Sequence, residues 1–183
     1  MNNTEREVLA AADALIEAFA RHDRDAYFAA FAPNASFVFH HVDTPLRTRA
    51  EYEALWREWE RDQAFAVLGC ESRDRDVQLF GDTAIFTHSV RTQLRTVAGT
   101  DTLNERETIV FARAGHRWLA VHEHLSPTPA QIPKLASESV SELGSAETQG
   151  SGLSTGHAAS GASHAAVGAA LSSVVVDVAG AQS

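Results

Sequence analysis

Ionisable side chains stand within two apolar segments late in the sequence. These segments are residues 102–111, with Glu105 and Glu107, and residues 118–125, with His122, Glu123 and His124. Both are rich in β-branched, aromatic and aliphatic residues, which is typical of strands. Carboxylates and imidazoles are common proton-transfer groups in enzymes. Because they are costly to bury without partners, strands that carry them usually meet a wet edge, a subunit contact or a polar cavity.

The histidines also raise the question of a metal site. His122 and His124 are two residues apart, so a strand would place them on one face, as in many metal-binding pairs. His40 and His41 offer further imidazoles, but the spacing fixes no third ligand. We therefore expect no metal and no cofactor. The sequence has no phosphate loop or nucleophile elbow, and Cys70 has no base beside it in sequence.

The composition limits the classes of function. The chain has 183 residues, 44% of them hydrophobic, and a formal net charge of −9. This supports one folded core, and an acidic chain without a basic stripe is a poor candidate for binding nucleic acid or an anionic membrane. The single cysteine excludes an intrachain disulfide framework. We find no secretory signal and no apolar run long enough for a membrane helix, and therefore expect a cytoplasmic protein.

Periodicity predicts the elements that position these groups. Apolar residues at helical spacing, with capping patterns at Thr4–Glu7 and Thr48–Glu51, predict helices over residues 5–21, 24–31 and 49–62. Alternation predicts strands over residues 35–41, 65–80, 84–95, 102–111 and 118–125. The charged run 71–76 is the middle of a strand or a solvated bend. The order is typical of an α+β fold, with helices on one face of a curved antiparallel sheet.

The chain divides into two parts by composition. Residues 1–128 hold the predicted elements and form one domain. Residues 129–183 are rich in Ser, Gly and Ala and contain almost no aromatic side chains. Such a segment cannot bury enough apolar surface to offset the loss of chain entropy, so we expect a disordered tail.

Three motifs in this domain carry a family resemblance. They are Asp23-x-Asp25, Phe31-Ala-x-Asn34-Ala-x-Phe37 and Trp118-x3-His122-x-His124-x-Ser126. With them, residues 5–126 resemble the NTF2-like superfamily, and within it the SnoaL-like proteins. The closing segment also resembles the association domain of calmodulin-dependent kinase II. The resemblance implies a cone of curved sheet around three helices, a ligand site inside it, and a homodimer contact on the outer sheet face.

The resemblance also implies which side chains face inward. It gives a group of ionisable residues, His88, Glu107 and Glu123, and on the last strand it turns Leu119 inward and Trp118, His122 and His124 outward. The implied pocket wall consists of Phe39, His41, Tyr52, Trp56, Phe86, Val90, Ile109 and Val121. Of the three reacting groups of ketosteroid isomerases, Glu107 matches the acidic donor. Phe39 replaces the catalytic base and Leu15 the oxyanion-hole tyrosine, so steroid isomerisation by that mechanism is not expected.

Two functions follow from this arrangement. One is binding of a small apolar molecule, with cofactor-independent isomerase, cyclase or dehydratase chemistry in which His88 is the base and Glu107 or Glu123 the acid. The alternative is a non-catalytic module for dimerisation or ligand sensing. In that case Glu107 pairs with Arg91 or Arg106, and His88 is a satisfied core histidine. An open cavity at these side chains favours the first function and a filled interior favours the second.

Overall fold

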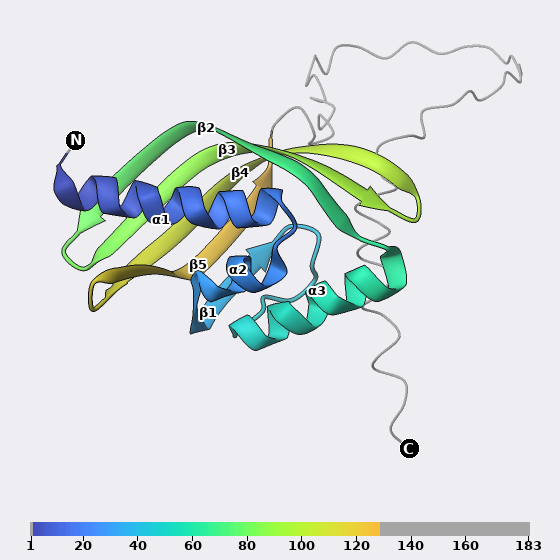
Figure 1. Ribbon diagram of the computed structural model, residues 1–183, viewed down its shortest axis with the longest axis horizontal. Coiled ribbons are helices and arrows are strands. Elements are labelled where there is room, and N and C mark those ends of the chain that lie inside the picture. The colour runs from blue at the N-terminus through green and yellow to red at the C-terminus, as the bar shows by residue number, and fades with distance from the viewer. Residues whose placement is uncertain (1, 129–183) are drawn as a thin grey trace, which may run out of the picture.

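The computed structural model describes residues 2–128, so the predicted tail lies outside the described residues. Three helices lie against one face of a strongly curved sheet (Figure 1), which confirms the α+β fold class. In chain order the elements are α1 (Asn3–Ala20), α2 (Arg24–Ala29), β1 (Phe31–Phe39), α3 (Arg49–Gln63), β2 (Ala66–Phe80), β3 (Thr83–Thr96), β4 (Gly99–Ala114) and β5 (Arg117–Pro127).

The sheet has the strand order β1-β5-β4-β3-β2. Strands β2 to β5 are antiparallel neighbours, as the alternating segments and short turns predicted. Strand β1 pairs in parallel with β5, so the sheet is mixed and not wholly antiparallel. A parallel pair needs a long connection, and α3 with three strands supplies it here. The charged run 71–76 lies inside β2, which is one strand with an irregularity between Arg73 and Asp76.

Local capping determines where two helices begin. Asn2 caps α1, with Oδ1 accepting from the Glu5 amide at 2.8 Å while Glu5 Oε2 accepts from the Asn2 amide at 3.2 Å. This reciprocal capping box starts the helix ahead of the position predicted from Thr4. For α3 the predicted cap is confirmed, because Thr48 Oγ1 accepts from the Glu51 amide at 3.2 Å.

A β-bulge in β5 changes which side chains face the helices. Val110 pairs with His122, but Phe111 pairs with Ala120, so Val121 has no partner on β4. The extra residue shifts the alternation. Trp118 is buried and its Nε1 lies 3.4 Å from Glu7 Oε2 of α1, while Leu119 is only partly buried. The prediction that Trp118 faces outward and Leu119 inward was therefore wrong.

The cone interior has two parts, a packed hydrophobic core and, closer to α3, a cluster of aromatic rings. Val8, Phe86 and Ile109 are fully buried in the hydrophobic core. Closer to α3 the rings pack edge to face or tilted, with Trp56 centred 5.1 Å from Phe65 and 5.5 Å from Tyr27. Such aromatic contacts position a ring more sharply than aliphatic packing does. Tyr27 and Phe65 of this ring cluster also line the cavity described next.

Candidate functional site

A cavity lies inside the cone, between α1, α3 and the sheet. Its wall is mostly apolar and aromatic, and includes Phe19 from α1, Tyr52 and Trp59 from α3, and Leu94 from β3. The cavity volume is about 60 Å³. The interior is thus hollow, but the cavity is small enough that it suits only a small molecule.

The predicted pocket residues take up three kinds of position. Phe39, His41, Tyr52 and Val90 line the cavity. Trp56, Phe86 and Ile109 are fully buried in the core and are not among the lining residues. Val121 is the extra residue of the β5 bulge, is only partly buried, and also lies outside the wall.

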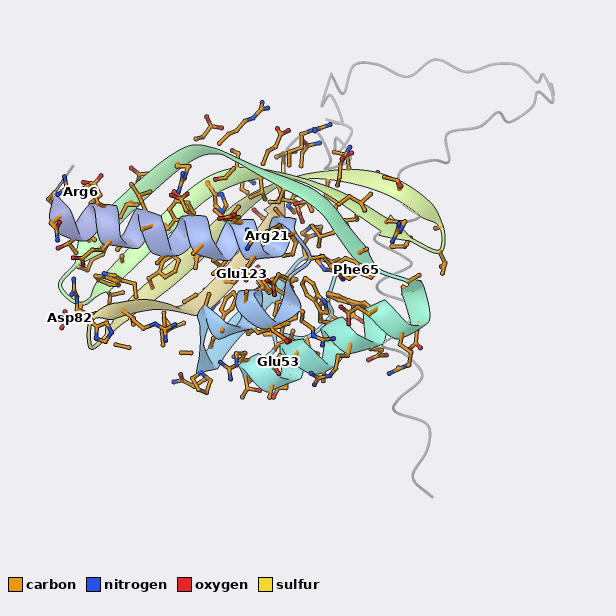
Figure 2. All side chains as sticks on the ribbon, in the orientation of Figure 1. Arg6, Arg21, Glu53, Phe65, Asp82 and Glu123 are labelled. Carbon is orange, nitrogen blue, oxygen red and sulfur yellow. The ribbon has the colours of Figure 1, made fainter. Side chains whose placement is uncertain are left out.

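Two carboxyl groups meet on this wall. Glu107 comes from β4 and Glu123 from β5, and both line the cavity (Figure 2 labels Glu123 in the middle of the fold). Burial, and then the charge of Glu107, raise the pKa of Glu123 well above its ordinary value. Burial also raises the pKa of Glu107 to about 7, although a hydrogen bond with Glu123 opposes that rise. Two carboxyls that cannot both ionise hold a proton between them near neutral pH.

Tyrosine hydroxyls lie against this pair. Tyr27 Oη of α2 donates to Glu123 Oε2 at 2.9 Å, and Tyr27 and Tyr52 interact through their hydroxyls. Burial raises the pKa of both phenols well above 10, so both remain donors. Tyr27 was not among the site residues predicted from the sequence. Its pairing with Glu123 spans 96 residues, and no local pattern indicates it.

His88 lies behind Glu107. The two residues face each other across β3 and β4, and His88 Nε2 lies 2.6 Å from Glu107 Oε2. On its other side, His88 Nδ1 lies 2.7 Å from Ser72 Oγ of β2. The imidazole is fully buried and is not part of the cavity wall. Burial, and then the charge of Arg75, lower the pKa of His88 to about 4, so the ring is neutral at pH 7.

The arginine partners suggested for Glu107 lie elsewhere. Arg91 Nη1 is 3.8 Å from Glu71 Oε1, and Arg106 Nη2 donates to the Pro127 carbonyl at 3.4 Å. The alternative in which Glu107 pairs with one of these arginines was therefore wrong. Among residues 2–128, no Lys or Arg side chain belongs to the cavity wall, so the carboxyl groups there have no cation from this part of the chain beside them on the wall.

A family model described as the SnoaL-like domain matches residues 8–131. The chain belongs to this family. Among curated proteins no match is found for it. The match to the family model confirms the SnoaL-like resemblance that was inferred from the sequence motifs.

Solved structures similar to this SnoaL-like domain share its fold. An NTF2-like protein from Cytophaga hutchinsonii is 13% identical, with a TM-score of 0.59 over 69% of this chain and 99% of that chain. A putative calcium/calmodulin-dependent protein kinase II association domain from Xanthomonas campestris is 21% identical, with a TM-score of 0.57 over 68% and 87%. The S. rosetta CaMKII hub is 26% identical, with a TM-score of 0.53 over 67% and 95%. These likenesses confirm the NTF2-like fold.

One group of side chains in the SnoaL-like domain has the composition of a metal site. His40, His41 and Glu105 each bring one donor atom to within 4.8 Å of the others, the sole such group in residues 2–128. His40 Nε2 already lies 2.6 Å from Glu105 Oε1, so these two are paired without an ion. His122 Nδ1 lies 2.9 Å from Ser36 Oγ, and its ring is centred 6.5 Å from that of His124. The expectation that no metal binds stays a prediction.

Within residues 2–128, no helix combines the length and the apolarity that crossing a bilayer requires.

Proposed function

We propose that this SnoaL-like domain binds a small, mostly apolar molecule in its cavity and moves a proton on it without a cofactor, as an isomerase, cyclase or dehydratase. The supporting observation is the Glu107–Glu123 carboxyl pair in the wall of an otherwise apolar hollow. A mostly apolar cavity with a few convergent polar groups is typical of small-molecule sites. Carboxyls with displaced pKa values in such a place are typical of proton-transfer sites.

The two carboxyls take different roles in this proposal. Glu107, with a pKa of about 7, accepts a proton from an acidic carbon of the ligand near neutral pH. Glu123, which stays protonated, turns its proton from Glu107 to the oxygen on which negative charge develops, as Glu107 itself becomes protonated. Tyr27 orients Glu123 through the 2.9 Å hydrogen bond.

His88 is a positioning residue in this scheme. Its ring contacts Glu107 and Ser72 but does not line the cavity, so it acts on the ligand only through Glu107. This changes the role expected from the sequence, in which His88 was the base. Because the imidazole is neutral, it fixes the Glu107 carboxyl without neutralising a negative charge on it.

Deuterium incorporation tests the proposal without knowledge of the natural substrate. Cyclopentanone is incubated in D₂O at pD 7.5 with the wild type, Glu107→Gln or Glu71→Gln, and exchange at its α carbons is followed by NMR. We expect the wild type and Glu71→Gln, a change at an exposed acid on β2, to accelerate exchange by ~10²-fold over buffer. Glu107→Gln should return it to the buffer rate. Equal rates for all three proteins and buffer would reject proton transfer.

A non-catalytic association module is the second candidate. It is favoured by the likeness to the S. rosetta CaMKII hub, which at 26% identity covers 95% of that chain. In this function the domain forms a homodimer through the outer sheet face, where Val110 and His122 pair across β4 and β5. Sedimentation of the wild type and Val110→Asp distinguishes the cases. A dimer that dissociates in the variant supports association, whereas a monomeric wild type excludes it. A cytoplasmic location is part of either proposal.

A further inference from the structure

Trp59 of α3 carries a buried hydrogen-bond donor without a partner. Its side chain is 3% exposed, and Nε1 is the sole buried side-chain nitrogen or oxygen in residues 2–128 that makes no hydrogen bond. A buried N–H left unpaired destabilises the folded state, because it loses its hydrogen bonds to water and gains none in return. Buried polar groups in native proteins are almost always paired, so an exception requires an explanation.

The position of Trp59 in the cavity wall explains why its N–H has no partner in the protein. Its ring is part of the cavity wall and is centred 5.8 Å from the His41 ring and 5.6 Å from the Phe65 ring. The other two tryptophans are satisfied within the protein. Trp56 Nε1 donates to Glu60 Oε1 at 2.8 Å, and Trp118 Nε1 lies 3.4 Å from Glu7 Oε2. The unpaired indole is thus the one on the cavity wall.

The charge of the cavity wall further restricts which chemical groups can accept a hydrogen bond from Trp59 Nε1. Glu105, Glu107 and Glu123 all line the cavity, and within the described part of the chain no Lys or Arg does. A carboxylate or phosphate placed there would meet like charge in a medium of low dielectric constant. The same surroundings favour a neutral oxygen, since it accepts from an N–H and also accepts from a protonated carboxyl.

We propose that the ligand of this cavity carries an uncharged acceptor oxygen, as in a ketone, ether or alcohol, that accepts a hydrogen bond from Trp59 Nε1, and that the site rejects anions. This inference rests on the proposed ligand-binding function and specifies its ligand class. Binding pairs the buried N–H and removes the cost of leaving it unsatisfied. The apolar remainder of the ligand contacts the aromatic wall.

The indole N–H resonances in a ¹H–¹⁵N NMR spectrum give a direct readout. The chain has three tryptophans, which Trp→Phe variants assign, and the paired Trp56 and Trp118 are internal controls. Three probes are compared at matched concentrations: cyclopentanone, methylenecyclopentane, which has its shape but no oxygen, and the cyclopentanecarboxylate anion. We expect cyclopentanone to shift the Trp59 resonance downfield and leave Trp118 unchanged. Methylenecyclopentane should bind without the downfield shift, and the carboxylate should not bind.

Affinities give a second test. Trp59→Phe removes the donor and should weaken cyclopentanone binding about tenfold while changing methylenecyclopentane binding less than about twofold. If cyclopentanone binds the wild type but the Trp59 resonance stays in place, this inference fails and the ligand-binding proposal stands. If the carboxylate binds as tightly as the ketone, the exclusion of anions fails. If no probe changes any resonance or the melting temperature, the ligand-binding proposal fails together with this inference.

Discussion

Tyr27 and Glu123 connect the helical layer to the last strand, with the phenol Oη donating to the carboxyl Oε2 at 2.9 Å. Both side chains are buried, and both line the cavity. Through Glu123 the contact extends to Glu107, and through Glu107 to His88 and Ser72. The carboxyl pair is therefore held from α2 on one side and from β3 and β2 on the other.

Removing one member of this network should destabilise the fold. Glu123→Leu leaves the buried Tyr27 hydroxyl and the Glu107 carboxyl without that partner, at a cost of about 1–3 kcal/mol. Glu123→Gln keeps an acceptor for Tyr27 and serves as the matched control. Urea unfolding at pH 5, where Glu107 is protonated, measures the difference. A Leu variant as stable as the Gln variant would show that the hydrogen bonds contribute nothing.

The raised pKa of Glu107 predicts a pH dependence of stability. The folded carboxyl, with a pKa of about 7, holds its proton more tightly than the unfolded one at 4.5. Its contribution is complete below pH 4.5 and is lost as pH rises to about 7. Glu107→Gln removes this loss, so its melting temperature relative to wild type should rise between pH 5 and pH 8. A constant difference across that range would contradict the assignment.

The two buried histidines make the stability of the fold depend on pH in the opposite direction to Glu107. Burial lowers the pKa of both His88 and His41 from 6.5 to about 4. Both rings therefore contribute stability above pH 6.5 that is lost as pH falls toward 4, because the unfolded chain takes up protons first. The ring ¹⁵N shifts should show that His88 stays uncharged from pH 8 to pH 5, with only a small step near pH 7 that follows its partner Glu107, while a denatured sample takes up a proton near 6.5. Conversion of the folded His88 ring to imidazolium with a midpoint above 6 would refute this.

The reactivity of the Cys70 thiol is an independent probe of the cavity. It lines the wall, and burial raises the pKa of its thiol to about 11. Because the thiolate is the reactive form, iodoacetamide at pH 8 should modify the folded protein at least ~100-fold more slowly than the urea-unfolded protein. Cyclopentanone should slow it further. Equal rates in the folded and unfolded states would mean that the thiol is neither buried nor shielded.

The β5 bulge is expected to be necessary for the fold. Deleting Val121 restores simple alternation and would turn either Trp118 or Glu123 away from the interior. We expect a loss of about 3 kcal/mol or more, or no folded protein. Val121→Ala keeps the extra residue, and because the side chain is only partly buried it should cost less than about 1 kcal/mol. Thermal unfolding of both variants measures this, and a stable deletion variant would contradict the role of the bulge.

Sequence reasoning succeeded where structure is local or periodic. The Thr48 cap depends on residues three apart, and the family resemblance grouped His88 with Glu107, which face each other across β3 and β4. It failed where one residue changes a register, as at Val121, and at the parallel pairing of β1 with β5. Neither the bulge nor the parallel pairing is indicated by the amino-acid composition of the strands. The partners Tyr27 for Glu123 and His40 for Glu105 join residues distant in sequence, and only the assembled fold brings them together.

The central claim is that the two carboxyls on the cavity wall share a proton near neutral pH. A ¹³C NMR titration of the glutamate side-chain carboxyls, with Glu107→Gln and Glu123→Gln for assignment, measures this directly. We predict a first deprotonation step of the pair near pH 7 and a second at higher pH. Two carboxyls that both titrate between about pH 4 and 5, like exposed glutamates, would contradict the account.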